Sequence, residues 1–413
     1  MSKKDARFKG AVTVVGLGVG PEDLPESHRL AIKEAEVLVG GKRQLAMFAG
    51  QAEATWSLGA NPRATLEEVK KEAAGRKVVI LASGDPLFFG IGQGALEVFG
   101  SENVAFLPNV TALQKAFARL KLPWNQSRSV SVHGRKVTEF FEEIGHAGAV
   151  AIYTDPENTP NLLAKILCEY GMANRKVAVV EDIGSEQERC LETDLAQAEK
   201  MRFSPLNVMV LYPEAEPRPV VRLGLEDDLF SKEKSLITKR DSRVLILAEL
   251  QIEPRGVMWD VGAGSGSVGI EAVRIAPGLR VYAVEQDQSR LEMIQDNVKR
   301  LGGFGVKAVL GEASAVLGDL PDPDRVFVGG SGGKLADILR IVEKRLRPGG
   351  RAVVSVVTPE SLGRAQNFVD KTHLAHEWLL LQVGRTVPIE SEKDVRLSRF
   401  QSQIPLFLLS LRR

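Results

Sequence analysis

A glycine-dense turn between two apolar segments constrains the fold of this chain more than any other feature. Residues 257–261 form a short, mostly apolar run of the kind found in a buried parallel strand. The turn at 262–266 then holds three glycines, which permit tight backbone angles and let the main chain approach a ligand closely. A helical pattern at 267–275 and a second apolar run at 281–284 follow. The order strand, turn, helix, strand predicts an α/β fold with a ligand at the turn.

Two carboxylates flank this turn and indicate what it binds. Glu285 ends the second strand, 19 residues after Gly266, where an acid can accept hydrogen bonds from the hydroxyls of a ribose. Asp260 lies two residues before the first glycine, where it would repel a pyrophosphate but could hold a cationic amino group. S-adenosylmethionine carries a ribose and an amino group but no phosphate, so it is the favoured ligand. Because Gly264-x-Gly266-x-x-Gly269 also matches the dinucleotide fingerprint, a nicotinamide dehydrogenase is the alternative.

Length, charge and cysteine content exclude several classes of protein. The 413 residues predict two or three domains, each with its own core. A net charge of +1 gives no field that would attract nucleic acid. Cys168 and Cys190 lack the spacing of metal ligands, so no metal is expected. Without a signal-peptide core or an apolar run approaching roughly 18 residues, we expect a soluble cytoplasmic protein that does not contact a membrane.

The first half of the chain contains two further turns that follow apolar strands. Residues 11–15 lead into a loop with three alternating glycines, which ends at Pro21. Residues 78–82 end in Ser83-Gly84-Asp85-Pro86, and a helix follows. This second arrangement places the turn at the carboxyl end of a strand, where open α/β sheets bind ligands. Taken singly, each loop is explained as well by ordinary turn chemistry.

Together with later segments, these loops resemble the tetrapyrrole methylases, in particular the CbiE-type enzymes of cobalamin biosynthesis. The resemblance rests on GLGVGPEDL, AEVLVGGKRQL, LASGDPLFFGIG, SVHGRK, TDPENTP and VVEDIGSEQER, and it covers about residues 11–212. It implies two α/β subdomains that close on S-adenosylmethionine. The residues that it implicates in cofactor binding are Gly16, Gly18, Pro21, Gly84, Asp85 and Pro86, with Thr111 where the family commonly has a serine pair.

A change in composition marks the boundary between the two halves. Residues 212–219 hold three prolines and two glutamates, which is typical of an extended connector. The residues that follow, to about 234, are polar and are expected to form a surface segment. We therefore predict one domain at 1–213, a linker at 214–235 and a second domain at 236–413.

The second half continues the alternation of strands and helices and resembles a second family. Seven strands are expected, with helices between the first five and an antiparallel late pair, as in the Rossmann-like methyltransferase fold. ITKRDSR, WDVGAGSGSVGIEA, DRVFVGGSGGKL and RPGGRAVVSVVTPE resemble the CbiT-type precorrin methyltransferase-decarboxylases, over about residues 236–413. The cofactor contacts implied by this resemblance and by the turn are Thr238, Asp260, Gly262, Ala263, Gly264, Ser265, Gly266, Glu285, Glu312 and Ala313.

A fusion of the two families implies one bifunctional enzyme with two S-adenosylmethionine sites per chain. It would methylate carbons 5 and 15 of a precorrin and remove carbon dioxide from the ring C acetate. Methyl transfer from a sulfonium requires mainly alignment and exclusion of water, so no catalytic residue is assigned. A precorrin carries many carboxylates, which basic side chains would position. The candidates for substrate contact are Arg43, His133, Arg135, Lys239, Arg240, Gly330, Ser331, Gly332 and Arg385.

The sequence leaves three alternatives open. The macrocycle could be free of cobalt or contain it, because the aerobic and anaerobic routes use similar halves. The chain could instead be a tetrapyrrole-binding protein with one degenerate half. The related families suggest a homo-oligomer, either a dimer or a tetramer, and the order of the two methylations is not determined.

Overall fold

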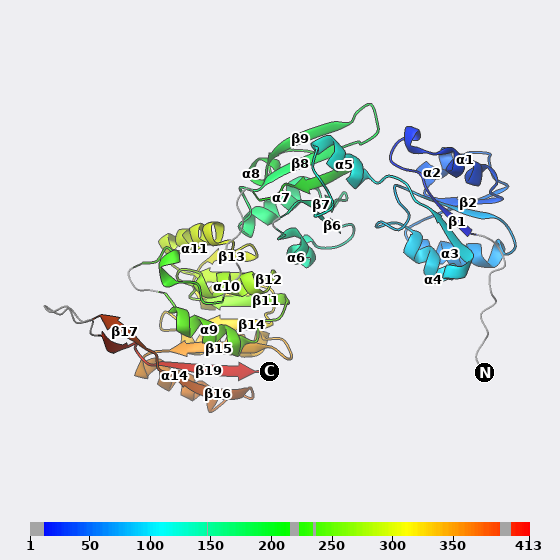
Figure 1. Ribbon diagram of the computed structural model, residues 1–413. Coiled ribbons are helices and arrows are strands. Elements are labelled where there is room, and N and C mark those ends of the chain that lie inside the picture. Colours follow the sequence, from blue (N-terminus) through cyan, green and yellow to red (C-terminus); the bar gives the residue numbers. More distant parts are fainter. Residues whose placement is uncertain (1–11, 147, 215–222, 234–236, 389–397) are drawn as a thin grey trace, which may run out of the picture.

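The computed structural model describes residues 12–146, 148–214, 223–233, 237–388 and 398–413. Within these residues the strands form two five-stranded sheets, one seven-stranded sheet and a separate two-stranded ribbon. Helices pack on the sheets, and the three larger units follow one another along the chain (Figure 1). The predicted α/β class is therefore confirmed. In the part of the chain so described, none of the helices has the length and apolar character needed to cross a membrane.

The first sheet has the strand order β3-β2-β4-β1-β5, and all of its strands are parallel. Parallel strands are covered on both faces, which explains why β4 is apolar and buried throughout. Because β4, β1 and β5 are neighbours, the loops at their carboxyl ends lie side by side. The elements are β1 (Val12–Gly16), η1 (Pro21–Asp23), α1 (Glu26–Lys33), β2 (Val37–Gly40), α2 (Lys42–Ala46), β3 (Ala54–Ser57), α3 (Pro62–Glu72), β4 (Val78–Ala82), α4 (Gly92–Phe99), η2 (Ser101–Asn103) and β5 (Val104–Leu107).

The second sheet has the order β6-β7-β10-β8-β9, with β6 and β7 parallel and the other pairs antiparallel. Alternate residues supply two separate apolar clusters, Ile152 and Val179 to one and Ala151 and Val180 to the other, so the clusters lie on opposite faces. The elements are α5 (Ala112–Leu120), β6 (Arg128–Ser131), η3 (Val137–Phe140), α6 (Phe141–Ile144), β7 (Val150–Tyr153), α7 (Pro160–Glu169), β8 (Lys176–Glu181), β9 (Arg189–Asp194), α8 (Leu195–Ala198) and β10 (Asn207–Leu211).

The third sheet has the order β13-β12-β11-β14-β15-β19-β16. Its first five strands are parallel, and β19 runs antiparallel to both of its neighbours. Apolar clusters cover both faces. The elements are η4 (Asp227–Leu229), α9 (Arg240–Leu250), β11 (Arg255–Val261), α10 (Ser267–Ile275), β12 (Gly278–Glu285), α11 (Gln288–Leu301), β13 (Val306–Leu310), α12 (Ala313–Val316), η5 (Leu317–Asp319), β14 (Arg325–Val328), α13 (Leu335–Arg345), β15 (Arg351–Val356), α14 (Pro359–Val369), β16 (Ala375–Leu381) and β19 (Leu406–Arg412).

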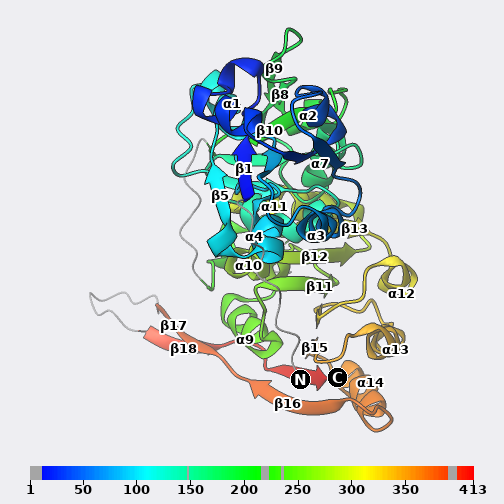
Figure 2. The same cartoon turned by 90° about the vertical axis from the view of Figure 1, so that its right-hand side faces the viewer.

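A ribbon of two antiparallel strands, β17 (Gly384–Pro388) and β18 (Ser398–Ser402), extends away from the third sheet (Figure 2). It joins β16 to β19 along the chain. The ribbon lies on the side of the sheet toward which β15 runs (Figure 1).

The described part of the predicted linker, residues 223–233, is mostly exposed or partly exposed but is anchored to the third sheet at two positions. Leu225 and Phe230 are buried in an apolar cluster of the third sheet. The backbone N–H groups of Gly224 and Leu225 donate to the buried carboxylate of Glu271, at 2.7 and 3.0 Å. Arg243 also pairs with Glu271, so this acid needs the partners that the segment supplies. Residues 215–222 and 234–236, which belong to the predicted linker and its border, lie outside the described residues.

Candidate cofactor and substrate sites

The glycine turn after β11 lies close to the turn after β14. Gly262, Gly264 and Gly266 have φ values of +68°, +58° and +73°, which L side chains rarely adopt. A Cβ on Gly262 would lie 2.7 Å from the backbone nitrogen of Gly330, in the turn after β14. A Cβ on Gly264 would meet nothing within 4 Å. The turn therefore needs glycine at 262 for packing, whereas at 264 it leaves open space in which a ligand can approach the backbone.

Glu285 is the last residue of β12, and only 4% of its surface is exposed. Its Oε2 accepts a hydrogen bond from the N–H of Gly264 at 3.0 Å. Its Oε1 accepts from the N–H groups of Gln286 and Asp287, at 3.0 and 3.2 Å. A carboxylate offers about four acceptor positions, so a ribose diol would share this group with the backbone. The carboxylate is therefore oriented toward the glycine turn before any ligand binds.

Asp260 lies beneath the same turn and is 1% exposed. Its Oδ2 accepts from the N–H of Gly269 at 3.0 Å, which ties the end of β11 to the first turn of α10. Its Oδ1 and the buried hydroxyl of Ser265 have no hydrogen-bond partner among the described residues. Burial, assisted by the charge of Glu285, raises the pKa of Asp260 to about 7. An acid with an unsatisfied buried oxygen is suited to a cationic ligand group.

The remaining residues that the sequence implicates in this site surround the turn. The N–H of Gly311 donates to the carbonyl of Glu285 at 2.9 Å, which brings the start of α12 beside β12. Glu312 precedes Ala313, and Lys334 binds its carboxylate at 2.5 Å and lowers its pKa. The Gly330–Gly332 turn with Ser331 contacts Gly262 from the other side.

Three predicted basic residues gather around the start of α9, and each has an acidic partner. Arg385 donates to Asp241 at 2.5 and 3.0 Å, and Arg240 pairs with Glu226. Lys239 lies 3.8 Å from Asp227. Thr238 accepts a hydrogen bond from Arg243 through its carbonyl at 2.6 Å. A substrate carboxylate that binds these cations would therefore replace an acid of the protein.

In the first half, loops from β1, β4 and β5 converge. The N–H of Gly84 donates to the carbonyl of Gly18 at 2.9 Å. A Cβ on Gly16 would lie 2.5 Å from the carbonyl oxygen of Gly84, and one on Gly84 would lie 3.3 Å from the Cα of Thr111. Pro21 begins the short helix η1. Pro86 is buried, and its carbonyl accepts from the N–H of Gly92 at 2.9 Å.

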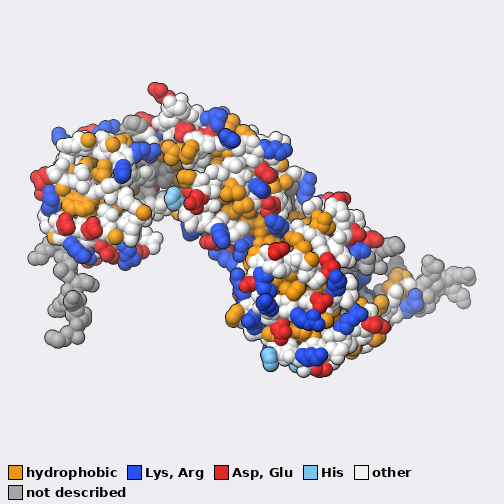
Figure 3. Space-filling model, turned by 180° about the vertical axis from the view of Figure 1, so that it is seen from behind, with side chains coloured by type: hydrophobic (Ala, Val, Ile, Leu, Met, Phe, Trp, Pro, Cys, Tyr) orange, Lys and Arg blue, Asp and Glu red, His pale blue; other side chains and the backbone are white. Residues whose placement is uncertain are grey.

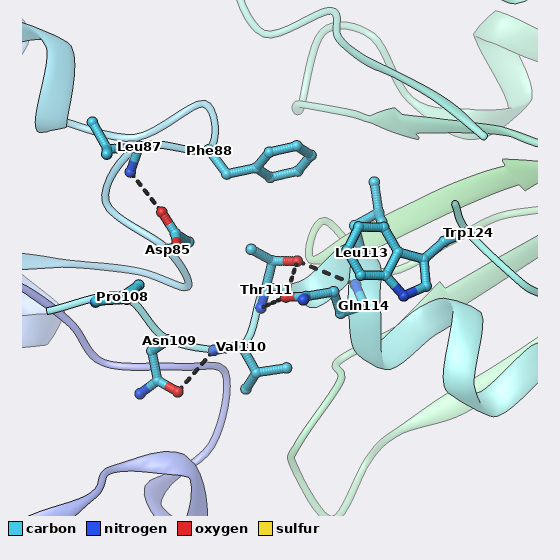
Figure 4. A pocket seen from close by; sticks show the side chains of 10 residues that line it. All are labelled: Asp85, Leu87, Phe88, Pro108, Asn109, Val110, Thr111, Leu113, Gln114 and Trp124. Carbon is cyan, nitrogen blue, oxygen red and sulfur yellow. Dashed lines mark hydrogen bonds between the residues drawn. The ribbon is translucent and has the colours of Figure 1, made fainter. Parts of the chain in front are cut away.

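A cavity of about 590 Å³ opens beside these loops (Figure 4). Its size is typical of small-molecule sites. One wall comes from the ends of β4 and β5, and the opposite wall comes from α5 and the segment after it. The lining residues are Asp85, Leu87, Phe88, Pro108, Asn109, Val110, Thr111, Leu113, Gln114 and Trp124.

Two predicted residues, Asp85 and Thr111, line this cavity, and both already have local hydrogen bonds. Asp85 Oδ1 accepts from the N–H of Leu87 at 2.8 Å. The hydroxyl of Thr111 caps α5 by accepting from the N–H of Gln114 at 3.2 Å. These bonds orient the polar groups at the cavity wall (Figure 4).

Sequence reasoning missed Asn109, which holds two loops together. Its amide nitrogen donates to the carbonyls of Gly16 and Asp23, both at 3.0 Å. It also missed an aromatic group at this cleft, in which Phe88, Phe89 and Tyr153 have ring centroids 4.8 to 6.1 Å apart. The only sequence signal was the adjacent pair of phenylalanines after the Ser-Gly-Asp-Pro turn.

Three other predicted substrate residues are not among those that line the cavity. Arg43 lies on the exposed side of α2, and His133 is exposed in the turn after β6. Arg135 donates to the carbonyl of Ser131 at 2.8 Å, and its guanidinium lies 4.6 Å from the centre of the Phe140 ring. Basic and acidic side chains are interspersed over the face seen in Figure 3.

Comparison with known families divides the chain at the same place as the fold. Residues 11–199 match the model of the tetrapyrrole (corrin/porphyrin) methylases. Residues 228–398 match a precorrin methyltransferase domain.

Three curated relatives indicate how the two parts are used elsewhere. The cobalt-precorrin-7 C(5)-methyltransferase of Salmonella typhimurium is 36% identical over 43% of this chain and 88% of its own length. The probable cobalt-precorrin-6B C(15)-methyltransferase (decarboxylating) of Pyrobaculum calidifontis is 37% identical over 40% of this chain and 87% of its own. The precorrin-6Y C(5,15)-methyltransferase [decarboxylating] of Sinorhizobium sp is 32% identical over 84% of this chain and 85% of its own. With both matched domains in one chain, the protein belongs to the precorrin-6Y C(5,15)-methyltransferase (decarboxylating) family.

Proposed function

We propose that this chain methylates precorrin-6Y, or its reduced form precorrin-6B, at carbons 5 and 15 and decarboxylates the ring C acetate, giving precorrin-8. The observation that supports the proposal is that one chain holds two separate features suited to a ligand. One is the glycine turn with its two buried acids at β11 and β12. The other is the cavity at the ends of β4 and β5. Two methylations of one macrocycle suit two such sites.

The residues at the glycine turn fit S-adenosylmethionine, which supplies an electrophilic methyl group when bound. Gly264 leaves its outer side open, and Glu285 can accept hydrogen bonds from ribose hydroxyls. The unpartnered Oδ1 of Asp260 supports a role in holding the amino group, directly or through water. No proton transfer is needed to activate the sulfonium, so these residues bind and orient rather than act as acid or base.

We assign the two reactions by the two matched families. The first half would methylate carbon 5, and the second half, with its Rossmann-like methyltransferase fold, would methylate carbon 15 and promote decarboxylation. Decarboxylation leaves an electron pair that the conjugated macrocycle itself can accept. The cations near α9 support the placement of substrate carboxylates, since Lys239, Arg240 and Arg385 gather there. We also propose domains at 1–213 and 236–413 joined by residues 214–235, and a homo-oligomeric assembly.

Isothermal titration and mass spectrometry together test this function. Titration of the chain with S-adenosylmethionine is expected to give two sites per chain. Incubation with precorrin-6Y and excess cofactor is expected to give a product with two added methyl groups and one carbon dioxide lost. A macrocycle that binds but gains no methyl group would instead identify a tetrapyrrole-binding protein. The same reaction with a cobalt-containing substrate distinguishes the two routes.

A further inference from the structure

The contact between the two halves resembles a domain core more than a hinge. Phe304 comes from the loop before β13, yet it is 7% exposed and belongs to an apolar cluster of the second sheet. Its ring centroid lies 4.9 Å from that of Phe141 in α6. The hydroxyls of Tyr170 and Tyr282, one from each half, are hydrogen-bonded at 3.0 Å and buried. Buried aromatic contacts of this kind hold two units in one orientation.

Polar contacts at the edge of this interface set how the two halves are aligned with each other. Arg255 pairs with Glu142 at 3.0 Å and with Glu143 at 3.1 Å. The N–H of Gly305 donates to the carbonyl of Tyr170 at 3.2 Å. Exposed ion pairs contribute little free energy but favour one arrangement over others.

The interface lies at the amino end of the parallel strands of the third sheet. Arg255 is the first residue of β11, and Gly305 directly precedes β13. Arg280, the third residue of β12, donates to the hydroxyl of Thr138 at 3.2 Å. The interface reaches the middle of β12 at Tyr282, and Glu285 stands three residues further at the carboxyl end, which at about 3.3 Å per residue is roughly 10 Å along the strand. The glycine turn therefore opens at the edge of the sheet that faces away from the first half.

The cavity of the first half is also separated from the interface. Phe304 packs into the cluster on one face of the second sheet, which includes Ile152. Leu113 lines the cavity and belongs to the cluster on the other face, as does Phe88. The second sheet thus stands between the cavity and the contact with the second half. In Figure 1 the first sheet, marked by β1 and β2, lies at the right, whereas β15 of the third sheet runs toward the left.

We propose that the macrocycle is released to solvent between the two methylations and is not passed through the chain. This inference rests on the proposed function. The carboxyl-terminal part of the third sheet separates the glycine turn from the interface, and the second sheet separates the cavity from it. Release also lets the macrocycle turn, because a different meso carbon must reach each methyl donor.

Two full-length variants, each impaired at one site, test the release. Glu285→Ala impairs the glycine turn, and Val110→Trp fills the cavity of the first half. Each variant must still bind S-adenosylmethionine at its unaltered site, which shows that it is folded. The lag before doubly methylated product appears is then measured by mass spectrometry, for the unaltered chain and for an equimolar mixture of the variants at the same concentration of each active site.

If the macrocycle is released, the lag of the unaltered chain should equal the lag of the mixture. Both lags should lengthen in proportion to the dilution of the proteins. Direct transfer would act at an effective concentration in the millimolar range, so at micromolar protein the unaltered chain would show a lag about 100-fold shorter than the mixture and insensitive to dilution. That result, or a mixture that makes no doubly methylated product, would overturn the release. An unaltered chain that transfers no methyl group would overturn the proposed function instead.

Discussion

The two candidate ligand sites of this chain are built from different chemical groups. Both lie where parallel strands end and glycines with positive φ bring backbone close to a ligand. The glycine turn of the second half adds two buried carboxylates, Asp260 and Glu285, within one strand–turn–helix–strand unit. The first site is a cavity between two sheets, and its one lining carboxylate, Asp85, is half-buried. The second candidate site therefore offers buried charge for selecting a ligand, whereas the first offers mainly shape and backbone geometry.

The largest expected effect comes from closing the glycine turn. In Gly262→Val the new side chain collides with the backbone of Gly330, and the φ of +68° is strained for valine. We expect the affinity of the second site for S-adenosylmethionine to fall by at least about 100-fold, or 2.7 kcal/mol. Titration calorimetry should then detect one site per chain instead of two. The matched control is Gly363→Ala on α14, whose Cβ also enters open space but lies away from the turn, so it should leave that site unchanged.

The second-largest difference in affinity between the two sites should come from removing the carboxylate of Glu285. Glu285→Ala deletes a carboxylate that accepts three backbone hydrogen bonds. A loss of about 2 kcal/mol, or roughly 30-fold in affinity, is expected at the second site because charged hydrogen bonds are worth about that much. The first site should bind as before, which equilibrium dialysis with labelled cofactor measures. Equal weakening of both sites would refute the assignment of this acid. Glu292→Gln, at an exposed position on α11, serves as the control.

The buried Asp260 should make only one of the two sites sensitive to pH. Its pKa of about 7 means that the carboxyl is neutral below that pH and charged above it. A cationic amino group is attracted only by the charged form, so affinity at the second site should fall as pH falls below 7, by up to about tenfold per unit. Binding isotherms at pH 8, 7 and 6 measure this change. A flat profile in the unaltered protein, or an unchanged slope in Asp260→Asn, would contradict the proposed role.

The smallest expected effect concerns the hydroxyl of Thr111 in the first site. Thr111→Val removes the cap of α5 and should lower the free energy of unfolding by about 1 kcal/mol. Thr111→Ser keeps the hydroxyl and should restore both stability and first-site affinity. Chemical denaturation and cofactor titration of the two variants provide the comparison. Full stability and affinity in the valine variant would show that the hydroxyl has neither role.

Much of the fold and of the second site could be predicted because the signals are local. The strand at 257–261, the turn and the helix at 267–275 are consecutive, and the helix has the predicted bounds. Glu285 lies at the end of β12 because strand length places it there. The loops at Gly16 and Gly84 could be expected at one sheet edge, since each follows a parallel strand.

Other features could not be predicted because they depend on residues far apart in the chain. Trp124, in the segment between α5 and β6, lines the first cavity together with Asp85 and Leu87, which follow β4. Leu225 and Phe230 look like part of a polar connector until the third sheet offers them an apolar surface. Each of these contacts reflects tertiary packing that no short pattern contains.

By itself the sequence determined the α/β class, the two halves, and the acids and glycines of the second site, because spacing along one strand and one helix sets those positions. Only the tertiary structure decided which loops enclose the first cavity and where the two halves touch. Phe304 illustrates the reason: it precedes a strand of the third sheet, yet its side chain is buried in a cluster of the second. The free energy of burying such a ring depends on a partner surface that exists only after both halves have folded.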